Sequence, residues 1–391
     1  MTDSIALVKE NLFLLLRLGL GFSSYEKEIP KYNPTVIEEV YALAKKHDLA
    51  HIVAFAIKKH SLACDEEIRA KLEKQYFTAV YRYQHQNHDL EVISDLFEEA
   101  EIMHIPLKGS VLRKFYPYEW MRIGCDIDIL IKPEDVERAM NLMQDKLGYK
   151  YIKHGGHDET LSSPAGTHIE LHFDLIEEDE DGVDVVLQDF WKYTSPDENK
   201  KFRYTVRDDM LYYYHIAHMA KHFINGGCGL RPVLDSYILI NTFPYDREAR
   251  IALLERGGLA RFSSIAEKLA GVWFSKEEHN EISKKTEDYI LDAGVYGDMH
   301  NAIVNKMAEK DGSKMKYLLS RIFLPYLQLR VQYPYLDGRK WLLPVYQVRR
   351  WFRLLFRGKL RRSINEINTS LSVKENENDE RGAFLRSVGL L

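Results

Sequence analysis

Asp126-Ile127-Asp128-Ile129-Leu130-Ile131 is the stretch that decides the fold of the middle of the chain. Its isoleucines recur at every second residue, which predicts a β-strand with one face in the core. The same period places the carboxylates of Asp126 and Asp128 together on the other face. Two neighbouring carboxylates repel each other unless a cation or a proton intervenes. Because Mg²⁺ prefers oxygen ligands and often joins protein carboxylates to phosphates, this strand is a candidate metal site.

A turn that can approach a phosphate precedes this strand, at Lys108-Gly109-Ser110. Its glycine lets the backbone lie close to an anion, and its serine can donate a hydrogen bond. The N–H groups of a following helix would also point at a bound phosphate. Lys108 and Arg113 either add positive charge here or face solvent, and Arg122 either reaches a phosphate or pairs with an acid.

A third acid, Glu170, lies on a later predicted strand over residues 167–175. The apolar residues at 169, 171 and 173 alternate toward the core, which leaves Glu170 on the opposite face with His168, His172 and Asp174. If the two strands are neighbours, three carboxylates converge. Two metal ions about 3.5–4 Å apart can activate an attacking oxygen and stabilise a leaving one. The combination predicts metal-assisted transfer of a nucleotidyl group.

The hydrophobic pattern divides the chain into four parts. Residues 1–100 are predicted to be helical, with the longest helix from Glu66 to about Ala100, and residues 101–206 hold the strands. Residues 207–335 are helical again, and 336–391 form a basic amphipathic helix and a polar tail, of which 372–382 is expected to be disordered. The expected fold class is therefore α+β, a small mixed sheet flanked by N-terminal and C-terminal helical regions.

Composition narrows the class of protein. The net charge of −5 is too mild to indicate a polyanionic partner, and 45% apolar residues suffice for a core. Three widely spaced cysteines argue against a disulfide framework and favour a cytoplasmic location. The N-terminus has no secretory signal pattern, and no apolar run is long enough to span a bilayer. An acidic loop at 177–182 is expected to be solvated rather than to bind a metal.

Three histidines share one face of a helix predicted from about 208 to 223. His215, His218 and His222 are spaced i, i+3 and i+7. They can bind a transition metal, line a nucleotide pocket beside the sheet, or lie satisfied in the core. In the second interpretation His218, Lys221 and His222 contact the nucleotide, with Lys221 at a phosphate. In the first, Asp235 would join the histidines in a metal phosphohydrolase.

A basic segment follows at 338–362. It carries nine Lys and Arg residues and no acid, so the rest of the chain carries −14, which is −5 minus +9. Aromatic and aliphatic residues are interleaved with the basic ones. Such a helix can pack on the acidic body of the protein, lie on an anionic membrane surface, or, less favoured here, grip nucleic acid.

These motifs resemble the polymerase-β-like nucleotidyltransferase superfamily, whose signature is matched by Gly109-Ser110, Asp126-x-Asp128 and a strand-borne Glu170. The chain is more specifically similar to the bacterial "uncharacterised nucleotidyltransferase" family. That similarity rests on Leu107-Lys108-Gly109, Tyr116-Pro117, Arg122, the stretch from Asp126 to Leu130, Gly148-Tyr149, His218, Lys221-His222, Leu230-Arg231 and Asp235, and on the later Tyr333-Pro334 and Leu342-Leu343-Pro344. The resemblance implies a sheet core with both aspartates on one strand, Mg²⁺ and an NTP donor. It implies no particular acceptor.

The predicted reaction is Mg²⁺- or Mn²⁺-dependent transfer of NMP from an NTP such as ATP to a hydroxyl or phosphate acceptor, with release of pyrophosphate. Asp126 and Asp128 would hold the metals, and Glu170 would bind the metal on the nucleophile side or act as a base. The β- and γ-phosphates would lie at Gly109 and Ser110. Further nucleotide-binding candidates are Lys108, Arg113, Arg122, His218, Lys221 and His222. The non-enzyme alternative is a nucleotide-binding scaffold that kept the fold.

Overall fold

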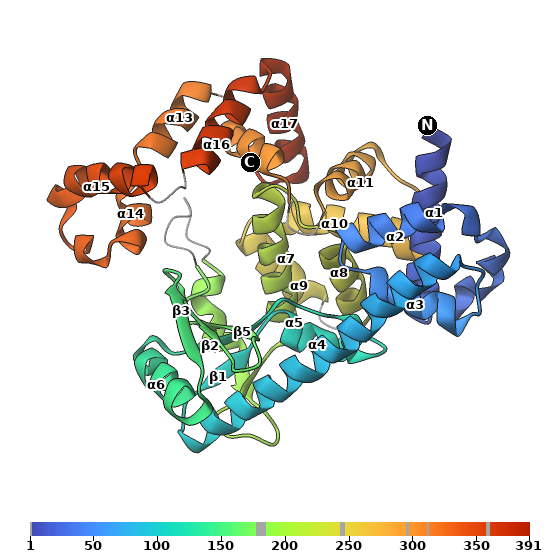
Figure 1. Ribbon diagram of the computed structural model, residues 1–391, viewed down its shortest axis with the longest axis horizontal. Helices are drawn as coiled ribbons and strands as arrows, with labels where there is room; N and C mark the ends of the chain where they lie inside the picture. Colours follow the sequence, from blue (N-terminus) through green and yellow to red (C-terminus); the bar gives the residue numbers. More distant parts are fainter. Residues whose placement is uncertain (1, 177–184, 243–246, 295–296, 311–312, 357–359) are drawn as a thin grey trace.

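The protein is built around a five-stranded β-sheet, with helices before and after it in the chain (Figure 1). This computed structural model describes residues 2–176, 185–242, 247–294, 297–310, 313–356 and 360–391. The predicted α+β class with helical flanks is confirmed. The acidic loop at 177–182 lies outside the described residues.

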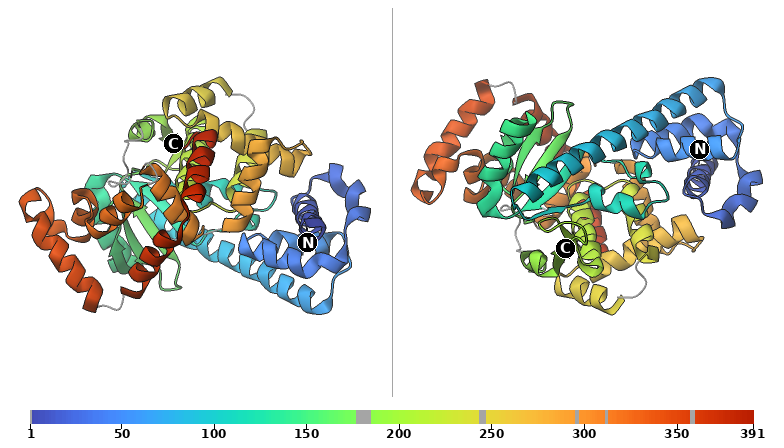
Figure 2. Two further views of the ribbon diagram at one scale, coloured as in Figure 1. Left: turned by 90° about the horizontal axis from the view of Figure 1, so that it is seen from above. Right: turned by 90° about the horizontal axis from the view of Figure 1, so that it is seen from below.

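Four helices precede the sheet, α1 (Thr2–Gly19), α2 (Ile37–Lys46), α3 (Ala50–Lys59) and α4 (Glu66–Glu99). Helix α4 begins after Asp65, whose carboxylate accepts hydrogen bonds from the N–H groups of Glu67 and Ile68. Such a cap satisfies donors that a helix start otherwise leaves unpaired. Helix α4 is long enough to run from the N-terminal helices to the sheet, as both views of Figure 2 show.

The sheet has the strand order β1-β2-β5-β4-β3. Its strands are β1 (His104–Pro106), β2 (Asp126–Ile131), β3 (Lys150–His154), β4 (Asp158–Ser162) and β5 (His168–His172). Strands β2 and β5 are parallel, and the other pairs are antiparallel. The short helix α5 (Gly109–Leu112) lies between β1 and β2, and a separate hairpin is formed by β6 (Thr194–Pro196) and β7 (Tyr204–Val206).

One face of the sheet is apolar. Ile127, Ile129 and Ile131 of β2 are fully buried with Ile169 and Leu171 of β5. They share a core with residues of α4 and of α6 (Val136–Leu147), which ends at Gly148 in the left-handed conformation (φ 69°). The period of two then turns the acidic side chains to the opposite face.

The helices that precede the sheet in the sequence and those that follow it share a second, larger core. The later helices are α7 (Asp208–Ile224), α8 (Arg231–Thr242), α9 (Arg247–Arg256), α10 (Ala260–Ser275), α11 (Glu281–Ala293) and α12 (Met299–Glu309). Phe13 of α1 stacks on Trp273 of α10 with ring centroids 4.9 Å apart. The N-terminal helices are therefore part of the same packed body as α7–α10.

The C-terminal helices are α13 (Lys314–Ile322), α14 (Tyr326–Gln332), α15 (Leu343–Phe356), α16 (Leu360–Ser372) and α17 (Glu375–Val388). The prediction of disorder at 372–382 is wrong, because most of this stretch belongs to α17. Val373 is buried in a small core with Ile303 and Met307 of α12, and Glu377 pairs with His300 at 2.6 Å. Tertiary packing thus orders a segment whose own composition is too polar to form a core. Among the described residues, no helix combines the length and apolarity needed to cross a bilayer.

The basic segment at 338–362 has some residues packed in a core and others exposed. Tyr346 is buried against Leu329 and Leu336, whereas Trp341 and Phe352 are 77% and 56% exposed. The segment therefore combines the packing expected of a terminal helix with an exposed apolar face.

Candidate active site

The carboxylates of β2 and β5 meet on the polar face of the sheet. In the parallel register Asp128 lies directly opposite Glu170, and Asp126 lies opposite His168. Residues opposite each other on paired strands project to the same side. Asp126 and Asp128 therefore share one patch of the sheet with Glu170, which lies more than forty positions later in the sequence. His172 joins them from two residues beyond Glu170.

Asp128 is the most heavily bonded of these acids. Its Oδ1 accepts hydrogen bonds from Lys108 Nζ at 2.7 Å and from His172 Nε2 at 2.8 Å, and the residue is 3% exposed. Burial alone would raise the pKa of Asp128, but the charge of Lys108 and the hydrogen bond from His172 outweigh it and lower that pKa. The carboxylate is therefore ionised at neutral pH. Burial opposes protonation of Lys108 and of His172, yet Asp128 raises the pKa of both.

A group that can hold a metal forms around this carboxylate. Among the described residues, ligand atoms of Asp128, Glu170 and His172 all lie within 4.8 Å of one another. His172 also keeps a buried Nδ1 that has no hydrogen-bond partner. Two carboxylates and one imidazole suit a divalent cation, with the oxygens favouring Mg²⁺ and the nitrogen also compatible with Mn²⁺. The alternation of β5 had placed His172 on the face of Glu170, but its pairing with Asp128 depends on the strand register.

Asp126 lies beside this group without belonging to it. It is partly buried on the same face of β2 as Asp128. Burial, followed by the charges of Asp128 and Glu170, raises the pKa of Asp126 to about 6. A nearby cation would stabilise the ionised form of a carboxyl that is held near like charges.

The turn at 108–110 approaches the carboxylates through a lysine. Lys108 has a positive φ of 47°, which is rare for a residue with a side chain, and its ammonium donates to Asp128. A Cβ on Gly109 would lie 3.2 Å from Arg122 Nη1, so glycine allows that approach. Helix α5 spans only Gly109–Leu112, and the N–H groups of residues 110–112 bond to the carbonyls of Leu107 and Lys108. The expectation that these amides point at a phosphate is therefore wrong.

The two arginines near this turn already have protein partners. Arg113 is buried and donates to Gly109 O and to Gln86 Oε1. Arg122 pairs with Asp235 at 2.9 Å, and Tyr116 donates to the same carboxylate at 2.6 Å. Arg122 was expected either to reach a phosphate or to pair with an acid, and in the structure it pairs with an acid. This buried cluster joins the loop before β2 to helix α8.

The histidines of α7 do not form a metal group of their own. His215 Nε2 lies 2.9 Å from both Pro232 O and Ser236 Oγ, so this side chain is satisfied within the core. His218 and His222 approach each other with their Nε2 atoms 3.1 Å apart. Burial, followed by the charges of Lys108 and His222, lowers the pKa of His218. Because Asp235 is held by Arg122 and Tyr116, the described residues do not assemble the His/Asp phosphohydrolase centre. His218 and Lys221 lie instead on the helix beside the carboxylate patch, where Tyr214 also feels the charges of Lys108 and Asp128.

Comparison with known protein families gives one match. The model of a family described as "Uncharacterised nucleotidyltransferase" matches residues 33–275, which is more than half of the chain. Neither the curated proteins nor the solved structures contain a significant match. The matched segment includes the turn, both aspartates, Glu170 and the histidine helix.

Proposed function

The chain belongs to this uncharacterised nucleotidyltransferase family, and on that premise we propose that it transfers NMP from an NTP to a hydroxyl or phosphate acceptor with release of pyrophosphate. The observation that carries the proposal is the register that sets Asp128 opposite Glu170, with Asp126 on the same face. Lys108 and His172 compensate the charge of Asp128, but Asp126 still lies among like charges that raise its pKa, and a bound cation would relieve that repulsion. We propose residues 101–206 as the catalytic part of the chain.

The proposed bonding change is a displacement at phosphorus. The acceptor oxygen forms a bond to the α-phosphorus, the bond from that phosphorus to the bridging oxygen breaks, and pyrophosphate leaves. The proton of an acceptor hydroxyl passes to a carboxylate. Glu170 can take this role because the imidazole of His172, 3.6 Å away, lowers the pKa of Glu170 and keeps it ionised. Mg²⁺ or Mn²⁺, held by Asp128 and Glu170 with Asp126 or His172, would supply Lewis-acid stabilisation of the phosphoryl oxygens.

The other residues predicted to contact the nucleotide differ in how firmly their side chains are held by protein partners. Lys108 is the first candidate, because an ammonium that now neutralises Asp128 could turn to a phosphate once a cation binds that carboxylate. His218, Lys221 and His222 would line the nucleotide from α7. Gly109 and Ser110 would contact phosphate through the glycine N–H and the serine hydroxyl. Arg113 and Arg122 would act mainly by fixing the shape of the turn.

The test is titration calorimetry with Mg-ATP and with Mg-GTP. The wild type should bind at least one of them, and Asp126→Ala combined with Asp128→Ala should abolish binding. The matched control is Glu137→Ala combined with Asp145→Ala, which removes two exposed acids of α6 on the other side of the sheet. Absence of binding by the wild type, or equal binding by the two double variants, would refute the proposal. Binding without transfer to any acceptor in a cell extract would favour a non-catalytic scaffold.

We also propose a location for the protein near an anionic membrane surface, through α15. The exposed apolar residues Val345, Val348 and Phe352 are spaced by three and four positions, which places them along one side of α15. Exposed Trp341 lies just before them, in the short 3₁₀ helix η8 (Lys340–Leu342). The surrounding segment carries nine positive charges and no negative one. An apolar stripe flanked by basic residues suits the boundary between anionic headgroups and acyl chains. A cytoplasmic location stays a prediction.

A further inference from the structure

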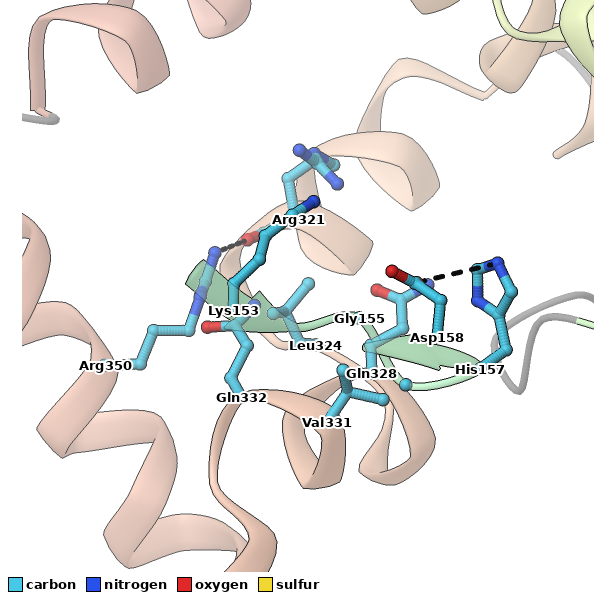
Figure 3. Close-up of a pocket in the computed structure, with 11 residues that line it drawn as sticks. Lys153, Gly155, His157, Asp158, Arg321, Leu324, Gln328, Val331, Gln332 and Arg350 are labelled. Carbon is cyan, nitrogen blue, oxygen red and sulfur yellow. Dashed lines mark hydrogen bonds and ion pairs between the residues drawn. The ribbon is translucent and has the colours of Figure 1, made fainter. Parts of the chain in front are cut away.

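A pocket opens between the sheet and the C-terminal helices, beyond the edge of the carboxylate patch. It has a volume of about 410 Å³, within the range of roughly 300–1,000 Å³ typical of small-molecule sites. One wall is the turn that joins β3 to β4, and the other wall comes from α13, α14 and α15 (Figure 3). The pocket therefore unites residues 153–158, which lie within the family match, with residues 321–350, which all lie outside it.

Two consecutive glycines shape the sheet side of this pocket. A Cβ on Gly155 would lie 1.9 Å from Asp158 Oδ1, and a Cβ on Gly156 would lie 3.1 Å from the side chain of Val331 in α14. Gly156 also has a φ of +83°, which favours glycine. The turn can thus press against both Asp158 and α14 only because neither position has a side chain.

The charges of the pocket are separated between its two ends. Lys153, Arg321 and Arg350 gather at one end, and Asp158 with His157 lies at the other (Figure 3). Arg321 is balanced by Glu366 at 2.6 Å, whereas Arg350 donates only to main-chain carbonyls, at Arg321 and Ile322, in the described contacts. Lys153 has no ion pair among the described residues. Lys153 and Arg350 therefore make no direct ion pair with an acid in the described part of the chain, although Arg350 lies within the electrostatic reach of Glu366.

The acidic end of the pocket adjoins the candidate active site. Asp158 is 5% exposed, accepts a hydrogen bond from Thr160 Oγ1 at 3.1 Å, and lies directly opposite His172 on the neighbouring strand. The rings of His157 and His172 are 5.4 Å apart between centroids. Because His172 bonds to Asp128, a molecule in the pocket would end next to the carboxylates. The nucleotide candidates on α7 and in the 108–110 turn take no part in lining this pocket.

We propose that this pocket binds the acceptor and that the acceptor is a phosphorylated hydroxyl compound. Its phosphate would lie at Lys153, Arg321 and Arg350, since paired cations of this kind bind phosphate oxygens. Its hydroxyl would point past Asp158 toward Asp128 and Glu170. This assignment rests on the proposed nucleotidyl transfer for the acceptor role, while phosphate binding itself can be measured independently.

The experiment is calorimetry of the full chain with ribose 5-phosphate and glycerol 3-phosphate, and with ribose and glycerol as neutral counterparts. At least one phosphorylated compound should bind, and the neutral ones should not. Lys153→Glu should weaken binding by about tenfold or more, and Lys153→Arg should retain it. Lys150→Glu makes the same charge change at an exposed position of β3 outside the pocket, and should leave binding unchanged. No binding of either phosphorylated compound, equal binding of the neutral ones, or equal effects of the two Glu variants would overturn the proposal.

Two further titrations separate this proposal from the proposed function. Phosphorylated compound should still bind when Mg-ATP is saturating, because the two ligands use different residues. Competition between them would place the pocket in the donor site and overturn the acceptor assignment. The variant with Asp126→Ala and Asp128→Ala should keep the phosphorylated compound and lose Mg-ATP. A wild type that binds the phosphorylated compound but no nucleotide would refute the nucleotidyl transfer and leave the phosphate pocket standing.

Discussion

Asp126→Asn should make the protein more stable at neutral pH while it weakens binding of the Mg-nucleotide. Burial and the charges of Asp128 and Glu170 raise the pKa of Asp126 from 3.8 to about 6. This difference corresponds to ~3 kcal/mol of unfavourable free energy for the ionised form. Because Asp126 is only partly buried, solvent screening reduces the expected gain from asparagine to about 1–2 kcal/mol.

The sign of the pH dependence follows from the direction of that shift. The folded protein keeps the proton of Asp126 at pH values where the unfolded chain has released it. The stability contributed by the protonated carboxyl is complete below the ordinary pKa of 3.8 and is lost as the pH rises through about 6. The free-energy gain of Asp126→Asn over the wild type should therefore grow between about pH 4 and pH 6 and level off above.

Asp128→Asn is the matched control two residues along the same strand. Its carboxylate accepts from Lys108 and His172, and these partners lower its pKa. Removal of one member of a buried ion pair leaves the other charge uncompensated, so this variant should lose about 3 kcal/mol or more. The same substitution therefore has opposite effects on stability at Asp126 and at Asp128, although both should lose Mg-nucleotide.

The assay is urea unfolding followed by tryptophan fluorescence, with EDTA present so that no bound cation stabilises the wild type. Measurements at about pH 4.5 and pH 7.5 bracket the titration of Asp126. If Asp126→Asn is no more stable than the wild type at the higher pH, or if the two variants shift in the same direction, the electrostatic account of this patch is wrong.

Two further predictions concern parts of the chain outside the carboxylate patch. Asp235→Asn should destabilise the protein by about 3 kcal/mol or more in urea unfolding, because it breaks the buried cluster with Arg122 and Tyr116; an unchanged midpoint would mean that the cluster does not hold the loop to α8. Trp341→Ser combined with Phe352→Ser should lower sedimentation with phosphatidylglycerol vesicles by about tenfold or more, because two exposed apolar anchors are removed. A wild type that sediments no better with these vesicles than with phosphatidylcholine vesicles would rule out the membrane face.

The sequence by itself determined the parts whose signal is local. The alternation in β2 and β5 fixed which residues face the core, and the helical pattern placed the start of α4 at Glu66. The Asp-x-Asp pair and Glu170 could be selected as acids on polar strand faces because the period of a strand is two. The polar tail was misjudged because composition reports only what a segment can bury by itself, and Val373 is buried by α12.

The tertiary structure alone decided which partners these residues have. Parallel pairing of β2 with β5 brought Glu170 and His172 to Asp128, and the turn before β2 brought the ammonium of Lys108 to the same carboxylate. Arg122 pairs with an acid 113 positions later, and the acceptor pocket joins the β3–β4 turn to helices about 170 residues farther along the chain. Such choices depend on long-range packing and desolvation, which act between segments whose local sequences carry no record of each other.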